Sequence, residues 1–365
     1  MEVSKLAHRG RQDHQRGVAL LISLSVILLL SIALMKNFEK RSIEVAHLGN
    51  NLERFQAESL SRSVFKVILI SIKEQGLIAL LGNRSYWQGI DFSLGNGFFR
   101  IQEVTPIDHR FNLNQRIGDG VAPRVTVFKN MVRINRKLLG GYDDPSGENE
   151  NEALSAINDW VDRDQDMDKV FLYDAEQYYR EEPSFSVKNR EFDRLSEVRL
   201  LPAFRVLGIT AEYLENNFRV LGEYDEYIDI NLNREKEIKD FLNRYENVAG
   251  YPNVFERQNE IWKLIEEQQI SESPNLLSGP SEVKTPFPAK DFGRIWKDAL
   301  IAAGVNLEDK ELSLFKPNSK NLFIRFRVQV GKATVNIRST VRVKYLKPEK
   351  NLDIGELTIL SFRII

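Results

Sequence analysis

The stretch Val18–Met35, VALLISLSVILLLSIALM, contains no charged residue and is followed directly by Lys36. With a rise of about 1.5 Å per residue, its 18 residues make a helix of roughly 27 Å, just long enough to cross the hydrocarbon core of a bilayer. The residues before it carry more Lys and Arg than Asp and Glu. This charge distribution predicts a single-pass anchor with a cytoplasmic N-terminus and the rest of the chain across the membrane.

Hydropathy alone leaves three interpretations of this N-terminus. A cleaved secretory signal is disfavoured because the apolar run is long and no clear small-x-small cleavage site follows it. A plain signal anchor is what hydropathy by itself favours. A prepilin-type leader is the third interpretation, and the basic residue and glycine directly before the run, Arg16-Gly17, support it.

The helical pattern continues beyond the apolar run. No proline occurs before Pro106, and from Val45 onward apolar residues recur at steps of three to five, at Leu48, Leu52, Phe55, Leu60, Val64 and Val67. A single helix from Val18 to about Leu81 would be on the order of 95 Å long. Its first part suits lipid, and its amphipathic second part is expected to pack on a globular head.

The C-terminal region has the clearest strand pattern. Apolar residues alternate with polar ones in Leu322–Val330 and again in Ala333–Tyr345, and Gly331-Lys332 between them suits a two-residue turn. A third strand is predicted at Gly355–Ile365. We expect an antiparallel sheet with one wet face, whose apolar face is covered by the long helix.

The middle of the chain is predicted to be mainly helical. Residues 140–152 have the composition of a solvated loop, and helices are predicted at Ala153–Asp162 and Arg234–Tyr245. The tripeptide Asn-Leu-Asn occurs at 112–114, after a predicted strand at Gly97–Thr105, and again at 231–233. Because strands lie at both ends of the chain, the helical part is most simply an insertion into the head. Residues 250–310 contain no diagnostic pattern.

Several weak motifs in a fixed order resemble the type IV pilin and pseudopilin superfamily, and within it the K-type minor pseudopilins of the type II secretion system. The leader reads RGVALLI at 16–22, with Ile22 where most members of the superfamily have glutamate. The motifs that follow are Asn-Leu-Asn at 112–114, Asp-Trp-Val-Asp at 159–162, the segment YDAEQYYR at 173–180 and Leu-Ser-Glu-Val-Arg at 195–199. The resemblance covers most of the chain except roughly 250–310.

This resemblance implies an α+β, pilin-like fold in which a long N-terminal helix packs on an antiparallel sheet and a large helical domain is inserted. The implied divisions are a prepilin leader at 1–17, a transmembrane part of the helix at 18–36, the amphipathic helix and first strands of the head at 37–115, the inserted domain at 116–315 and the closing strands at 316–365.

The resemblance also implies a function in assembly without bond-making chemistry. Prepilin peptidase would cleave between Gly17 and Val18, and the new N-terminus would be methylated. The mature protein would stay in the bacterial inner membrane with its C-terminal domain in the periplasm. There it would join the I- and J-type minor pseudopilins at the tip of the pseudopilus, above the inner-membrane secretion platform. A subunit with nothing above it has no need of the glutamate that Ile22 replaces, because that carboxylate neutralises the amine of the next subunit.

Two other functions remain open. One is a minor pilin of a type IV pilus, which the missing glutamate and the inserted domain disfavour. The other is a signal-anchored periplasmic binding protein or enzyme whose leader only resembles that of a prepilin.

An acidic segment is the one candidate metal site. Residues 159–168 hold five carboxylates in ten positions, a density that repels itself unless a cation or solvent relieves it. The EF-hand pattern does not fit, because Met167 and Tyr173 stand where its glycine and bidentate glutamate belong. A solvated loop is the alternative. The resemblance implies calcium in the inserted domain, with Asp162, Asp164 and Glu176 as the first candidate ligands and Asp159, Asp166, Asp168 and Asp174 as the next.

Composition excludes several other functions. The chain has no cysteine, so disulfides and thiolate sites are absent, and its formal net charge of −1 gives no case for nucleic-acid binding. We find no catalytic motif of the Gly-x-Ser-x-Gly, HExxH or phosphate-loop type, and the four histidines are scattered along the chain. Asp108 and His109 are expected in a surface turn. Trp160, Tyr178 and Tyr179 are expected either to anchor a small helical core or to form a partner-binding patch.

Overall fold

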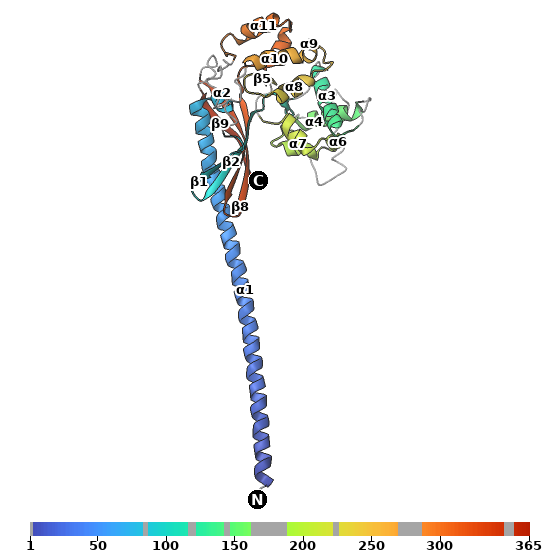
Figure 1. Cartoon of the computed structure of the whole chain (residues 1–365). Helices are drawn as coiled ribbons and strands as arrows, with labels where there is room; N and C mark the ends of the chain where they lie inside the picture. The colour runs from blue at the N-terminus through green and yellow to red at the C-terminus, as the bar shows by residue number, and fades with distance from the viewer. Residues whose placement is uncertain are drawn as a thin grey trace.

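The chain is described by a computed structural model that covers residues 3–82, 87–115, 122–141, 147–161, 188–221, 226–268, 287–346 and 354–365. Its first element is the helix α1 (Val3–Gln75), which runs without interruption through Lys36 and projects from the head as a rod with the N-terminus at its far end (Figure 1). At 1.5 Å per residue the rod is about 110 Å long. The predicted continuity of the helix is confirmed.

The long helix ends earlier than its hydrophobic pattern indicates. We predict the end near Leu81, but α1 stops at Gln75 and a short helix, α2 (Leu77–Gly82), follows it. Gly76 between them has φ of +78°, and its N–H still donates to the carbonyl of Ile72. A left-handed residue of this kind terminates a helix, and glycine adopts it without the steric cost that a side chain brings.

The head contains one five-stranded antiparallel sheet in the order β1-β2-β7-β8-β9. Its strands are β1 (Asp91–Leu94), β2 (Gly97–Pro106), β7 (Asn321–Val330), β8 (Ala333–Tyr345) and β9 (Ile354–Ile364). The predicted hairpin is confirmed, since Val330 pairs with Ala333 across Gly331-Lys332. The α+β fold class predicted from the sequence is therefore confirmed.

One face of the sheet packs against the last five turns of α1. The buried positions of the helix follow helical spacing, at Ala57, Ser61, Val64, Phe65, Ile68 and Ile72. They meet the alternate, inward residues of the strands in a single core. Phe65 lies at its centre, with its ring 6.2 Å from that of Phe326 on β7 and 5.0 Å from that of Phe362 on β9. The amphipathic helix and the sheet thus cover each other's apolar faces.

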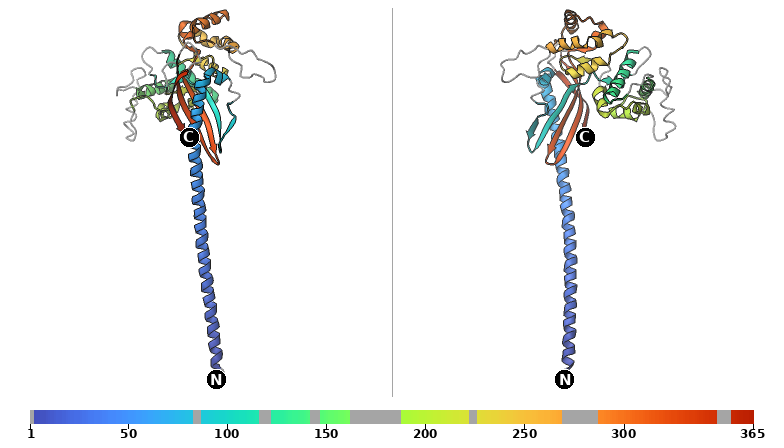
Figure 2. Two further views of the ribbon diagram at one scale, coloured as in Figure 1. Left: turned by 90° about the vertical axis from the view of Figure 1, so that its left-hand side faces the viewer. Right: turned by 45° about the vertical axis from the view of Figure 1, so that its right-hand side comes forward.

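A mainly helical insert lies between β2 and β7 and has a separate core. Because Pro106 of β2 pairs with Leu322 of β7, the insert stands where a hairpin loop would connect two neighbouring strands. Figures 1 and 2 show it beyond the end of the sheet and beside the face that α1 leaves open. The sheet face predicted to be wet is therefore partly covered, for example where Arg338 of β8 forms an ion pair with Glu215 of the insert.

The insert consists of two halves. The first contains β3 (Phe111–Asn112), α3 (Ala122–Leu138), α4 (Glu148–Val161), the 3-10 helix η2 (Leu195–Leu200), α6 (Pro202–Val206), α7 (Ala211–Asn217) and β4 (Phe218–Arg219). The second contains β5 (Ile228–Asp229), α8 (Glu235–Asn243), α9 (Pro252–Glu256), α10 (Gln258–Gln268), α11 (Phe292–Ala302), α12 (Asp309–Leu312) and β6 (Phe315–Lys316). In each half the first short strand pairs in parallel with the last, β3 with β4 and β5 with β6.

One predicted loop is partly helical. Residues 140–152 have a loop composition, yet α4 begins at Glu148. The acidic residues of its first turn lie at the end of the helix that favours negative charge. Glu150 is buried there in an ion pair with Arg136 of α3, at 2.6 Å. Glu150 therefore serves the packing of the helix start, whereas Glu148 and Glu152 are exposed as predicted, and residues 142–146 lie outside the described part of the chain.

Candidate functional site

The protruding part of α1 is the first candidate for a functional surface. Its residues from Leu28 to Phe55 leave twelve large apolar side chains exposed, at Leu28, Leu29, Leu30, Ile32, Leu34, Met35, Phe38, Ile43, Val45, Leu48, Leu52 and Phe55. The helix reaches the head only near Glu53, whose carboxylate accepts a hydrogen bond from the Lys332 N–H at 2.8 Å. An apolar surface of this extent on a monomer indicates a contact with lipid or with other proteins.

The predicted membrane anchor coincides only in part with described side chains. Among the residues whose side chains the structure describes, which on α1 begin at Leu28, no helix is long and apolar enough to cross a membrane. The first ten residues of the predicted span, 18–27, lie outside that set. Gly17 and Val18, the predicted cleavage site, belong to α1, but their side chains are likewise not described.

Of the predicted calcium ligands, only Asp159 falls in the described part of the chain. It lies near the C-terminal end of α4 and is 1% exposed. The other six lie outside the described residues, namely Asp162, Asp164, Asp166, Asp168, Asp174 and Glu176. The described residues alone contain no group of three His, Cys, Asp or Glu side chains placed to hold a metal ion. The calcium site stays a prediction.

Trp160 is part of the core of the insert. It is buried, and its ring stacks on that of Phe192 with the centroids 5.5 Å apart. Of the two alternatives, an anchor for a helical core and an exposed patch, the first is confirmed for this residue. Tyr178 and Tyr179 lie outside the described residues, as does the motif at 173–180.

The first Asn-Leu-Asn element fastens the first half of the insert. The side-chain carbonyl of Asn114 accepts from the Phe192 N–H at 2.7 Å, and its amide donates to the carbonyls of Phe192 at 3.0 Å and Val220 at 2.6 Å. The turn itself is closed by Asn112, whose side-chain oxygen accepts from the Asn114 N–H at 3.0 Å. A single buried amide thus joins the start of this half to two later segments.

The second half repeats this arrangement with a shift of two residues. Asn231 accepts from the Phe287 N–H at 2.9 Å and donates to the carbonyls of Phe287 at 2.9 Å and Pro317 at 2.8 Å. Asp229 takes the place of Asn112, since its carboxylate accepts from the Asn231 N–H at 2.9 Å. The structural equivalent of Asn112-Leu113-Asn114 is therefore Asp229-Ile230-Asn231, and not the second Asn-Leu-Asn, as the sequence suggests.

Asp108 and His109 are buried, which contradicts the predicted surface turn. The Asp108 carboxylate accepts from the N–H groups of Lys320 at 2.9 Å and Asn321 at 3.0 Å and from the Asn321 amide at 2.6 Å. It therefore joins the two points at which the chain enters and leaves the insert. His109 lies 3.3 Å from the Asn233 amide, and burial holds the pKa of its imidazole well below the usual value. The turn is buried because the insert packs over it.

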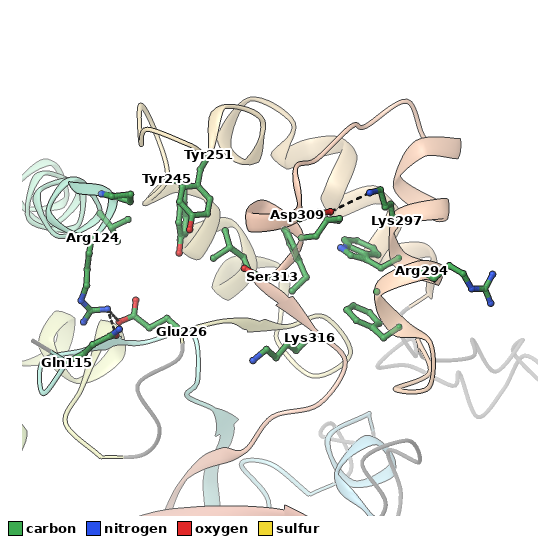
Figure 3. A pocket seen from close by; sticks show the side chains of 18 residues that line it. Gln115, Arg124, Glu226, Tyr245, Tyr251, Arg294, Lys297, Asp309, Ser313 and Lys316 are labelled. Atoms are coloured by element: carbon green, nitrogen blue, oxygen red, sulfur yellow. Dashed lines mark hydrogen bonds and ion pairs between the residues drawn. The ribbon is translucent and has the colours of Figure 1, made fainter. Parts of the chain in front are cut away.

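A cavity of about 970 Å³ lies between the two halves of the insert (Figure 3). Arg124 of α3 stands on one side and donates to Glu226 at 2.5 Å and to Gln115 at 2.6 Å. On the other side Lys297 of α11 forms an ion pair with Asp309 at 3.4 Å. The hydroxyl of Ser313 in the lining donates to the Lys310 carbonyl. The described lining thus combines two ion pairs with aromatic rings, among them those of Tyr245 and Tyr251.

No protein-family model and no curated protein matches this sequence. Among solved structures, the chain is similar to a chain in the GspK-GspI-GspJ complex of the type 2 secretion system of enterotoxigenic Escherichia coli. The two are 14% identical, with a TM-score of 0.50, over 85% of this chain and 98% of that chain. At this identity the likeness establishes the fold. The chain therefore has the pilin-like α+β fold of a subunit in that secretion complex, which is the fold that the sequence predicts.

Proposed function

We propose that this chain is a K-type minor pseudopilin of a type II secretion system, with a role in assembly and no enzymatic activity. The observation that carries the proposal is the exposed apolar stretch of α1 between Leu28 and Phe55, continuous with a helix that docks on the sheet. Such a rod offers a long surface for bundling with other helices. The likeness in fold to a subunit of the GspK-GspI-GspJ complex supports the same role.

The partners that fit this role are the I- and J-type minor pseudopilins and the pseudopilus that they begin. We propose a position at the tip, because the insert is bulky and Ile22 replaces the glutamate that would neutralise a subunit above. The N-terminal part of α1 would be held in the lipid of the inner membrane beside the secretion platform, with the head in the periplasm. Prepilin peptidase would cleave after Gly17.

Two measurements test this proposal. The mass of the membrane-extracted protein should correspond to a chain that begins at methylated Val18, and Gly17→Asp should leave the leader attached. An intact N-terminus in the wild type would instead support a signal-anchored protein of another class. The full chain should also co-purify with I- and J-type minor pseudopilins. Co-purification with the minor pilins of a type IV pilus in their place would support the second alternative.

A matched pair of variants locates the contact. Leu48→Lys places a charge in the exposed apolar surface of α1 and should abolish co-purification, whereas Asn50→Lys places the same charge at an exposed polar position and should retain it. The head should stay folded in both, because neither residue touches the sheet core. Equal co-purification of both variants would remove this surface from the interface.

We further propose that the acidic segment that begins in the last turn of α4 binds calcium, on the strength of its five carboxylates within residues 159–168. Calcium should raise the melting temperature of the full chain by mass action, and magnesium should do so less. Asp162→Asn with Asp164→Asn should abolish the shift. The absence of both a calcium-dependent shift and a bound ion by elemental analysis would rule the site out without affecting the proposed role in assembly.

A further inference from the structure

A cleft of about 210 Å³ lies between the outer face of the sheet and the first half of the insert. Strands β7, β8 and β9 form one wall, and η2, α7 and β4 form the other. Its ionisable lining residues are five arginines and one carboxylate, namely Arg110, Arg199, Arg219, Arg338, Arg363 and Glu215. In a chain whose formal net charge is −1, this is a strong local excess of positive charge.

Arg110 is one of the two buried arginines of this lining, the other being Arg219. It is 6% exposed, its Nη1 donates to the Glu215 carbonyl at 2.7 Å, and its guanidinium carbon lies 5.3 Å from the centroid of the Phe323 ring. Its Nε has no acceptor among the described residues. Burial lowers the pKa of this arginine to about 10. A buried charged donor without an acceptor is costly, and an anion in the cleft would supply one.

The carboxylates near the cleft are already engaged in ion pairs. Glu215, the only acidic side chain among the described lining residues, is engaged by Arg338 in the ion pair that joins α7 to β8. Arg363 on β9 has a lowered pKa, first because of burial and then because Arg194 lies near it. Three further acids lie near these arginines, and each is paired with another base: Glu197 with Lys188 at 2.9 Å, Glu103 with Arg325 at 3.1 Å and Glu237 with Arg234 at 2.7 Å.

Part of the cleft wall is apolar, which indicates that the anionic group of the ligand is attached to an aliphatic group. Leu195, Leu214 and Phe218 of the insert and Phe323 of the sheet are among the lining residues. A free inorganic ion gains nothing from such walls, whereas the aliphatic part of a side chain buries its methylene groups there. The volume is below the roughly 300–1,000 Å³ of pockets for whole small-molecule ligands, and it suits one or two side chains.

We propose that this cleft binds a carboxylate carried by a peptide, namely an acidic side chain or chain end flanked by an aliphatic residue. The planar guanidinium presents parallel N–H donors that match the two oxygens of a carboxylate, so that one arginine at the rim and one at the base can hold the group from two sides. The site is independent of the proposed assembly through α1, because it lies on the opposite face of the sheet.

The experiment uses the full chain in detergent and two probes that differ by one charge, acetyl-Leu-Glu-Leu-amide and acetyl-Leu-Gln-Leu-amide. Calorimetric titration should give saturable binding of the first peptide and binding at least about tenfold weaker of the second, as the loss of a charge-assisted hydrogen bond requires. Equal affinity for the two peptides, or no binding of either, would overturn the proposal.

Two variants and a second anion complete the test. Arg363→Gln, at the exposed rim of the cleft, should weaken binding of the glutamate peptide about fivefold or more, whereas Arg327→Gln, an exposed arginine on β7 outside the cleft, should not change it. An equal loss in both variants would mean that binding reflects only general positive charge. Inorganic phosphate should compete weakly. Phosphate that binds more tightly than the peptide would show a site for free anions and refute the peptide assignment.

Discussion

Individual asparagine side chains hold each half of the insert together. Replacing Asn114 with Ala leaves the Phe192 N–H and the carbonyls of Phe192 and Val220 without their partner in a buried site. We expect a loss of about 2–4 kcal/mol in the free energy of unfolding, measured by urea denaturation, because each buried group left unsatisfied is costly.

Asn231→Ala should cost a similar amount in the second half, where the same three bonds are made. Asn336→Ala, at an exposed position on β8, serves as the control and should change stability by less than about 0.5 kcal/mol. A loss at Asn114 no larger than that of the control would mean that these bonds do not hold the insert together.

Asp229 makes the stability of the protein depend on pH. Burial is the main cause that raises its carboxyl pKa to about 7, and Asp108 adds to the effect. The unfolded chain loses this proton near pH 4 and the folded chain near pH 7, so the folded state binds more protons between these values. Stability from this residue is therefore present at low pH and falls as pH rises, by at most about 4 kcal/mol.

Asp229→Asn removes this titration and retains the acceptor for the Asn231 N–H, as Asn112 does in the first half. The variant should gain stability relative to the wild type as the pH rises from 5 to 7.5, measured by urea unfolding at both values. His109 contributes the opposite slope, because its lowered pKa costs stability as pH falls below about 6.5. A difference between variant and wild type that does not change with pH would contradict the raised pKa.

Residue identities alone could not assign these functions. The two Asn-Leu-Asn elements are visible in the sequence, but their correspondence is not, because Asp229 performs the task of Asn112 and moves the alignment by two positions. The burial of Asp108 could not be predicted from its neighbours in the sequence either. Its three donors belong to Lys320 and Asn321, more than two hundred positions along the chain.

At the scale of secondary-structure elements, α1 divides into a docked part and a protruding part. Phe65 is 4% exposed and packs on two aromatic rings of the sheet, while Phe55, less than three turns earlier, is 70% exposed. Phe65→Ala should lower the free energy of unfolding by about 3–5 kcal/mol, because it leaves a cavity in the core.

Phe55→Ala is the matched control on the same helix. It should leave the urea midpoint of the head unchanged and weaken co-purification with the minor pseudopilins. The two variants thus separate the stability of the head from assembly. A large loss of stability in Phe55→Ala would show that the protruding part is packed on the head in solution.

Elements with a simple periodicity follow from the sequence, and the predicted strand ends agree with the structure to within one residue, whereas the predicted end of α1 does not. The alternation in β7 and β8 and the spacing in α1 each follow from one buried face, so pattern alone defines them. The end of α1 depends on the backbone of Gly76, and the apolar residues of α2 continue the helical pattern beyond it. In residues 250–310 the helices α9, α10 and α11 have five, eleven and eleven residues, and segments of that length contain few repeats of a helical spacing.

For the whole molecule, the coupling of head and insert depends on Asp108. Its carboxylate accepts hydrogen bonds from the N–H groups of Lys320 and Asn321, where the chain leaves the insert. Beside it, the Ile107 N–H donates to the Asn321 carbonyl at 3.0 Å. Asp108→Ala should weaken this connection more than it weakens either core, because each core is a separate cluster. Scanning calorimetry should then resolve two transitions where the wild type shows one.

An exposed carboxylate of the same sheet provides the control for the calorimetric measurement. Asp91→Ala removes an exposed carboxylate that pairs with Arg100 at the edge of the same sheet, and it should leave a single transition. One transition in Asp108→Ala, merely shifted to lower temperature, would mean that the packing of Arg338 and Glu215 across the cleft is sufficient to couple the two cores.

The placement of the insert between two adjacent antiparallel strands makes the head a modular scaffold. Neighbouring strands lie about 4.8 Å apart, so a domain whose chain ends are that close could replace the segment between Pro106 and Leu322 and keep the strand pairing, with the loss of Leu232, which the insert contributes to the core of the head. A tight reverse turn in the same position would give a minimal head. The size of the insert is thus not limited by the packing of α1 on the sheet, because the chain enters and leaves the insert at neighbouring positions.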